Sequence, residues 1–190
     1  MFGTLNAPYG KYAVLGNHDY AEYIRGISKE EKEVQFEEIK KIHPKIGFDL
    51  LCNEHRYIEK DGQKIALVGV ENWGKSFKQA GDLSKASEGV NKNDFKILMS
   101  HDPSHWEAEV KQDDLNYHLT LSGHTHGLQM GIEIPGWFKW SPSKYVYKQW
   151  AGLYEEYGRY INVNRGFGYH AFPGRVGIWP EITVIELKKS

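Results

Sequence analysis

The stretch LSGHTHGLQM, residues 121–130, places His124 and His126 one residue apart in a loop bounded by glycines. The loop directly follows the apolar run that begins at Tyr117. A lone histidine is usually structural, whereas two histidines in a tight loop after a strand are typical of a metal site. If they bind metal, other parts of the chain must supply further ligands.

Two other apolar runs also end in polar loops that contain histidine. KYAVLGNHDY (11–20) ends in Asn17, His18 and Asp19, and FKILMSHDP (95–103) ends in His101 and Asp102. Loops that follow neighbouring buried strands meet at one edge of a layered α/β protein. We therefore expect the three loops to form one site.

The residue types in these loops suit divalent transition metals. Imidazole nitrogens suit ions such as Zn, Mn and Fe, while amide and carboxylate oxygens suit harder ions. Two histidines one residue apart can approach neighbouring ions, which favours a dinuclear centre with ions about 3.5–4 Å apart.

The ordered motifs GNHD (16–19), SHDP (100–103) and GHTHG (123–127) resemble those of the calcineurin-like metallophosphoesterase superfamily. The chain is most similar to its bacterial membrane-associated predicted phosphohydrolases, both at APYGKYAVLGNHDY and in the tail RGFGYHAFPGRVGIWPEITVIEL. The resemblance covers essentially the whole chain. It implies a four-layer α/β/β/α sandwich that hydrolyses phosphomonoesters or phosphodiesters with two Mn, Fe or Zn ions and a bridging hydroxide.

The resemblance also implies a role for each matching residue. Asn17, His101 and His124 would bind the second metal, and His126 would bind the first. His18 would not bind metal but would face the phosphoryl group, where it stabilises charge or protonates the leaving oxygen. Asp19 would organise its loop.

The chain departs from the family pattern because the expected Asp-x-His motif is absent and the only Gly-Asp, Gly81-Asp82, occurs out of order. These motifs supply the first-metal and bridging carboxylates. We therefore expect residues 1–190 to be an N-terminally truncated phosphoesterase domain with an incomplete four-layer sandwich. Such a chain should hold at most one ion and have impaired activity. The alternative is a non-catalytic relative that binds metal or phosphate.

Composition bounds the other possibilities. The chain has 190 residues and a formal net charge of −1, so one domain is expected and a phosphate-backbone nucleic-acid binder is not. Cys52 is the only cysteine, which excludes an intrachain disulfide and a cysteine-based zinc motif. No apolar run has the roughly 20 residues needed to span a bilayer. Relatives are often tethered through an N-terminal segment, so cytoplasmic and membrane-associated locations both stay open.

Several elements can be predicted outside the motifs. Residues 28–44 should form a helix with a Ser28–Glu31 capping box, a face shared by Val34, Ile39 and Ile42, and an end at Pro44. Asp61-Gly62 predicts a hairpin over 56–72, whose second flank should be buried on both faces. Residues 74–94 should hold a short helix with loops, and 159–164 and 181–187 should be strands.

The aromatic stretch IPGWFKWSPSKYVYKQW (134–150) permits two interpretations. It forms either a loop packed by its own aromatic residues or a surface that contacts a lipid-like substrate or a membrane. Arg165 and His170 are candidate substrate-binding residues, although an ion pair with Glu181 is an equal alternative for Arg165. Missing elements should expose apolar sheet surface and favour self-association. Leu128 adds bulk beside the histidine loop.

Overall fold

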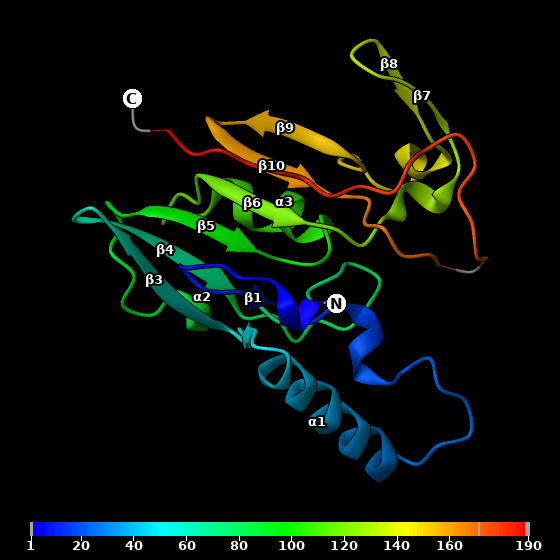
Figure 1. Ribbon diagram of the computed structural model, residues 1–190, viewed down its shortest axis with the longest axis horizontal. Helices are drawn as coiled ribbons and strands as arrows, with labels where there is room; N and C mark the ends of the chain where they lie inside the picture. Colours follow the sequence, from blue (N-terminus) through cyan, green and yellow to red (C-terminus); the bar gives the residue numbers. More distant parts are fainter. Residues whose placement is uncertain (1, 171, 189–190) are drawn as a thin grey trace.

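The computed structural model describes residues 2–170 and 172–188 and is built around a six-stranded mixed sheet. The strand order is β3-β4-β5-β6-β10-β9 (Figure 1). These strands are β3 (Glu54–Lys60), β4 (Gln63–Gly69), β5 (Phe95–Met99), β6 (Leu119–Ser122), β10 (Arg159–Val163) and β9 (Gly152–Glu156). The four inner strands are parallel, and the two edge strands are antiparallel to their neighbours. The predicted α/β class is confirmed.

The predicted hairpin and its buried second strand are also confirmed. Strands β3 and β4 pair from Lys60↔Gln63 outward, and the turn residues Asp61 and Gly62 have φ values of 51° and 70°. A two-residue turn of this kind needs φ above zero at both positions, which Asp-Gly accepts at low cost. Residues 66–70 are all buried, as expected for a strand covered on both faces.

The main core lies between one face of the sheet and its short helices. These helices are α2 (Leu83–Ala86), within the predicted segment, α3 (Ser104–Ala108) and η3 (Val110–Gln112). Alternating side chains Ala66, Val68 and Val70 of the β4 segment point to this face, where Trp106 is fully buried. This packing fixes β5 and β6, whose carboxyl ends carry the site.

A small parallel pair, β1 (Tyr12–Ala13) with β2 (Asp49–Leu50), is joined through α1 (Lys29–Lys45). The Ser28–Glu31 capping box is present, as predicted. The expected apolar face is wrong, because Val34 and Ile42 are exposed and the helix instead stacks Phe36 on Tyr20, with ring centroids 4.8 Å apart. Pro44 stands in the last turn rather than after it.

The predicted strand at 181–187 is wrong. No strand is present there, and among the described residues the only backbone–backbone hydrogen bond of this stretch runs from Glu181 N to the Gly166 oxygen. An extended segment becomes a strand only when a neighbour pairs with it along its length. Ile182 and Val184 are strongly exposed. Self-association through such surface stays a prediction.

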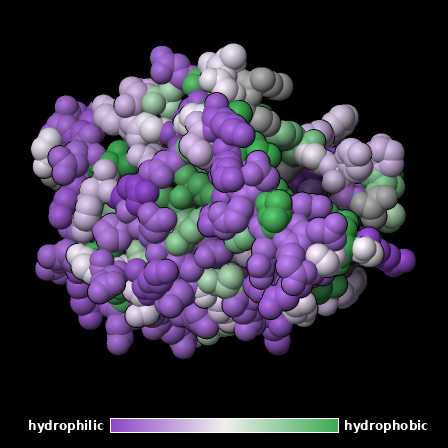
Figure 2. Space-filling model, turned by 90° about the horizontal axis from the view of Figure 1, so that it is seen from below, coloured by the Kyte–Doolittle hydropathy of each residue, from purple (hydrophilic) through white to green (hydrophobic). Residues whose placement is uncertain are grey.

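The remaining elements are short. They are η1 (Phe2–Thr4), η2 (Asn17–Tyr20), η4 (His126–Gln129), β7 (Ile132–Ile134), β8 (Phe138–Trp140) and η5 (Pro142–Tyr145). Seen from below, the surface is mostly hydrophilic with a few apolar patches (Figure 2). Within residues 2–170 and 172–188, no helix has the length and apolar character needed to cross a bilayer.

Candidate metal centre

The three predicted loops converge on one point. Asn17 opens η2, while His101 and His124 each follow the carboxyl end of a parallel strand, β5 and β6. Asn17 Oδ1 lies 3.2 Å from His101 Nε2 and 3.1 Å from His124 Nδ1, and the two ring nitrogens are 3.2 Å apart. Three potential ligand atoms from distant parts of the chain thus form a compact triangle.

This triangle fits a transition-metal ion in size and chemistry. Tetrahedral ligands about 2.0–2.1 Å from zinc are roughly 3.4 Å from one another, close to the spacing found here. Hydrogen bonds among His101 Nε2, His124 Nδ1 and Asn17 Oδ1 cannot satisfy all three atoms at once. A cation between them would accept a lone pair from each. The described parts of the chain contain no group of three His, Cys, Asp or Glu side chains arranged for metal. The third atom of the triangle is the amide oxygen of Asn17.

The histidines of the triangle are held in the neutral form that binds metal. Burial, together with the nearby imidazoles of His124, His126 and His18, lowers the pKa of His101 to about 3. Burial also lowers the pKa of His124, although the Asp102 carboxylate opposes this shift. Because metal ligation requires neutral imidazole, both rings are ready for a cation at pH 7.

Neighbouring groups orient two of the three ligands. Asn17 Nδ2 donates to the Tyr23 hydroxyl at 2.7 Å, which turns Oδ1 toward the histidines. His124 Nε2 lies 2.8 Å from the Tyr147 hydroxyl and 3.4 Å from Asp102 Oδ2. When Nε2 carries the proton toward these oxygens, Nδ1 keeps its lone pair for metal, as in other metal-ligating histidines.

The loop around Asn17 leaves space for the His101 ring. A Cβ atom at Gly16 would lie 2.8 Å from both Cε1 and Nε2 of His101, so only glycine permits this approach. The Asp19 carboxylate accepts a hydrogen bond from Gly16 N at 2.7 Å and closes the turn. The expectation that Asp19 organises its loop is therefore confirmed.

His18, His126 and His170 lie around the triangle without joining it. The His18 and His170 rings are 5.5 Å apart, those of His126 and His170 are 6.1 Å apart, and His18 stacks on Tyr23 at 4.4 Å. Nδ1 of His126 is buried and has no hydrogen-bond partner among the described residues. Burial lowers the pKa of His18 and of His126. The site thus has further neutral imidazoles beside the candidate ligands.

Gln129 connects the histidine loop with the segment that carries His170. Its Oε1 accepts a hydrogen bond from His170 N, and its Nε2 donates to the carbonyls of Phe172, at 2.8 Å, and of Gly174. The side chain is almost fully buried. These contacts hold His170 beside His18 and His126.

The two arginines near the site are engaged by the protein itself. Arg165 Nε lies 2.7 Å from a Glu181 oxygen, and its Nη1 lies 2.6 Å from a Glu133 oxygen. The arginine therefore forms the ion pair with Glu181 that was one of its two expected roles. Arg175 donates to the carbonyls of Arg165 and Gly168. Contact of Arg165 or His170 with substrate stays a prediction.

His105 has a structural role. It is fully buried, with Nδ1 2.9 Å from Ser100 Oγ and Nε2 3.2 Å from Glu109. Burial lowers its pKa to about 4. It is therefore neutral at pH 7 and stacks on Trp73.

Sequence reasoning missed Gly16, Tyr23, Gln129 and Tyr147 as parts of the site. No local pattern identifies the two tyrosines, because their contacts depend on how distant loops fold together. Leu128, by contrast, was noted from sequence, and its φ of 47° places it in the left-handed region that favours glycine.

The calcineurin-like phosphoesterase family model matches residues 2–128. The chain is 32% identical to the uncharacterized metallophosphoesterase YkuE of Bacillus subtilis, across 100% of this chain and 60% of the relative. It is 29% identical to the phosphodiesterase YaeI of Escherichia coli, across 93% of this chain and 57% of the relative. It is 26% identical to the UDP-2,3-diacylglucosamine pyrophosphatase LpxG of Chlamydia muridarum, across 70% and 48%.

The chain therefore spans about 60% of the length of YkuE and less of the other two. No solved structure shows a significant match to the chain. The family model covers well over half of the residues and includes all three histidine loops. On these grounds the chain belongs to the calcineurin-like phosphoesterase family.

Proposed function

We propose that the chain supplies the metal-binding half of a phosphoesterase site that hydrolyses phosphomonoester or phosphodiester bonds. The observation that carries the proposal is the convergence of Asn17 Oδ1, His101 Nε2 and His124 Nδ1 within 3.2 Å of one another. Family membership supports the reaction type, because YaeI is named a phosphodiesterase and LpxG a pyrophosphatase. Both names describe cleavage at phosphorus.

The ligand set favours a divalent transition ion, such as Mn, Fe or Zn, held by Asn17, His101 and His124. When bound, such an ion supplies Lewis-acid chemistry that polarises phosphoryl oxygens and activates water. Tyr23 and Tyr147 keep the ligands in position through their hydrogen bonds to Asn17 and His124. The side chains around the Asn17, His101 and His124 triangle would bind the phosphate and assist the leaving group.

His18 is the candidate catalytic residue. Its ring stands beside the triangle, stacked on Tyr23 and edge-on to His170. Because its pKa is lowered by burial and by His170, it is neutral at pH 7 and donates a hydrogen bond to a phosphoryl or leaving oxygen. His170, held by Gln129, contacts the other side of the substrate phosphate.

Residues 1–190 supply three ligands for one ion but only His126 for a second, because the sequence has no Asp-x-His. We therefore expect this chain alone to bind at most one ion and to turn over slowly. The same shortage of ligands for a second ion supports the second candidate function, a non-catalytic relative that binds metal or phosphate.

Hydrolysis of bis-p-nitrophenyl phosphate and p-nitrophenyl phosphate separates the two functions. Protein stripped with EDTA and reloaded with Mn²⁺ should show weak activity that falls about 10²- to 10³-fold in His18→Ala, because a hydrogen-bond donor to the phosphoryl or leaving oxygen is lost. Manganese binding should persist in that variant. His43→Ala, on α1 and outside the site, is the matched control and should retain both properties.

Manganese binding with no hydrolysis above the His18→Ala background favours the non-catalytic relative. Hydrolysis that survives unchanged in His18→Ala would show that the proposed role of this residue is wrong.

A further inference from the structure

The hairpin of β7 and β8 is attached to the protein through its polar side chains and exposes most of its apolar ones. The strand register pairs Ile132 with Trp140, Glu133 with Lys139 and Ile134 with Phe138. Side chains alternate between the two faces of a strand pair, so Glu133 and Lys139 share one face and the isoleucines and Phe138 share the other. One face of this hairpin is therefore polar and the other apolar.

The polar face is attached to the body of the protein. Glu133 accepts from Arg165 Nη1 at 2.6 Å. Lys139 Nζ donates to the Ala151 carbonyl at 2.5 Å and lies 5.5 Å from the centre of the Tyr154 ring. Ordinary surface hairpins place such polar residues in water and their apolar residues against the core. Here Glu133 and the exposed Lys139 both contact the body of the protein, whereas Ile132, Ile134 and Phe138 are exposed and make no such polar contact.

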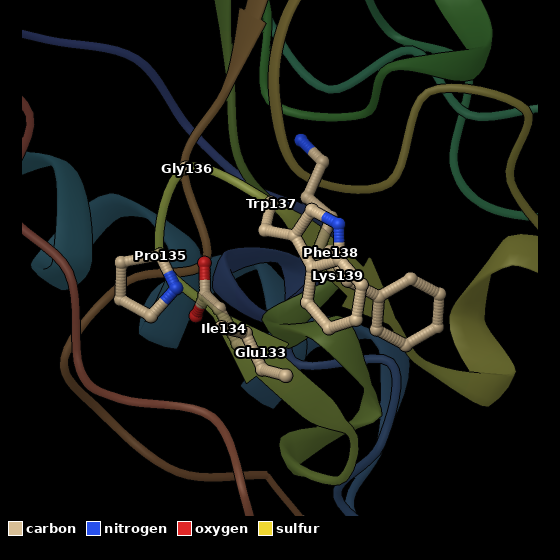
Figure 3. A pocket seen from close by; sticks show the side chains of 7 residues that line it. All are labelled: Glu133, Ile134, Pro135, Gly136, Trp137, Phe138 and Lys139. Carbon is tan, nitrogen blue, oxygen red and sulfur yellow. The ribbon is translucent and has the colours of Figure 1, made fainter.

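The other face, with the turn, exposes four large apolar side chains that we call the hairpin apolar face: Ile132, Ile134, Trp137 and Phe138. Trp137 is 82% exposed and Ile132 56% exposed. The Trp137 and Phe138 rings lie side by side at the end of the hairpin, with centroids 6.5 Å apart (Figure 3). The hairpin projects from the rest of the molecule (Figure 1). Exposed apolar surface of this kind marks an interaction site.

The charge around the hairpin favours an anionic surface as its partner. Within residues 130–147, the only carboxylate is that of Glu133, which Arg165 neutralises, while Lys139 and Lys144 are both cationic. The segment thus carries net positive charge in a chain whose formal net charge is −1. Tryptophan and tyrosine favour the lipid–water boundary, and Tyr145 beside Lys144 is also strongly exposed.

We propose that the hairpin apolar face docks the protein onto the lipid–water interface of an anionic bilayer. The hairpin directly follows the loop that carries His124 and His126, and Ser141 Oγ ties its far end back to the Gly127 carbonyl at 2.6 Å. Docking therefore brings the metal centre to the membrane surface, where phosphoesters of lipid headgroups are available. Binding itself does not depend on phosphoesterase activity, so the two proposals fail separately.

Cosedimentation with vesicles tests the docking. The 190-residue chain should bind vesicles of phosphatidylcholine mixed with phosphatidylglycerol and bind phosphatidylcholine vesicles weakly. The double variant Trp137→Ser/Phe138→Ser should lower the partition coefficient at least about tenfold, because it removes the two aromatic anchors. The matched control Val34→Ser/Leu153→Ser removes two apolar side chains that are 64% and 61% exposed elsewhere, and it should bind normally.

Tryptophan fluorescence gives a second measurement, which guards against the possibility that the double variant loses binding because it misfolds. Trp137→Phe keeps an apolar ring, so it should retain vesicle binding but lose most of the blue shift that we expect for the wild type on binding. The proposal is overturned if the wild type binds neither vesicle, binds both equally, or loses no affinity in the double variant. Self-association through the hairpin without vesicle binding would identify a second protein copy as the occupant and would equally overturn it.

Discussion

Gly16 controls how closely the His101 ring can approach Asn17. Its φ of −108° is open to any residue, so replacement by alanine adds no backbone strain and only fills the space used by the ring. A methyl group 2.8 Å from His101 Nε2 must displace that nitrogen from the triangle. We predict that Gly16→Ala weakens Mn²⁺ binding by about 10- to 100-fold, the range found when the groups that support metal ligands are changed.

Gly168→Ala is the control for this change, because no atom of the described residues lies within 4 Å of its added methyl group. Calorimetric titration of both metal-stripped variants should give wild-type affinity for Gly168→Ala only. Equal affinities for the two variants would mean that the position of His101 does not matter for binding.

His105 makes the stability of the protein depend on pH. Its pKa is lowered to about 4 by burial, whereas a histidine in the unfolded chain titrates near pH 6.5. The unfolded state therefore takes up the proton first as the pH falls, and the free energy of unfolding decreases between about pH 6.5 and 4. At pH 5 this group alone should cost about 2 kcal/mol relative to pH 7.5.

Urea unfolding at pH 7.5 and pH 5 measures the effect. His105→Gln cannot be protonated, so its loss of stability over this range should be smaller than that of the wild type by about 2 kcal/mol. The other buried histidines are the same in both proteins, so their contributions to the pH dependence cancel in the difference. Parallel losses in the two proteins would rule out His105 as a source of the pH dependence.

At the scale of elements, α1 is held to the protein by few contacts. It has no buried residue, and its amino-terminal end depends on the reciprocal Ser28–Glu31 capping box. We predict that Ser28→Ala costs about 1 kcal/mol of helix stability and speeds amide hydrogen exchange in residues 29–45. Ser28→Thr retains a capping hydroxyl and should restore most of the protection. Faster exchange spread evenly over the six-stranded sheet would contradict a local role.

Elements with local signals could be predicted from the sequence, and elements that depend on a distant partner could not. Asp61-Gly62 specifies the turn between β3 and β4 through its own backbone preferences, and Ser28 specifies where α1 begins. Residues 181–187 have a strand-like composition, but the described chain offers no partner along their length. The face of α1 was misjudged because Tyr20, on which Phe36 stacks, comes from another element.

At the scale of the whole molecule, the parallel inner strands explain why the metal ligands could be predicted. Asn17, His101 and His124 each follow an apolar run, and β5 and β6 deliver their loops to one edge. The supporting residues could not be found in this way. Tyr147 reaches His124 from a loop 23 positions later, and Tyr23 reaches Asn17 through the fold of a polar loop. Such contacts depend on the folded chain rather than on any periodic pattern.

The most direct test of the metal centre is a calorimetric titration of EDTA-treated protein with Mn²⁺, made in parallel on His124→Ala and on His105→Gln. The wild type and His105→Gln should each bind one ion, and His124→Ala should lose binding by at least about tenfold because a direct ligand is removed. Unchanged affinity in His124→Ala would contradict the assignment of Asn17, His101 and His124 as ligands, and tight binding of two ions would contradict the expected single site.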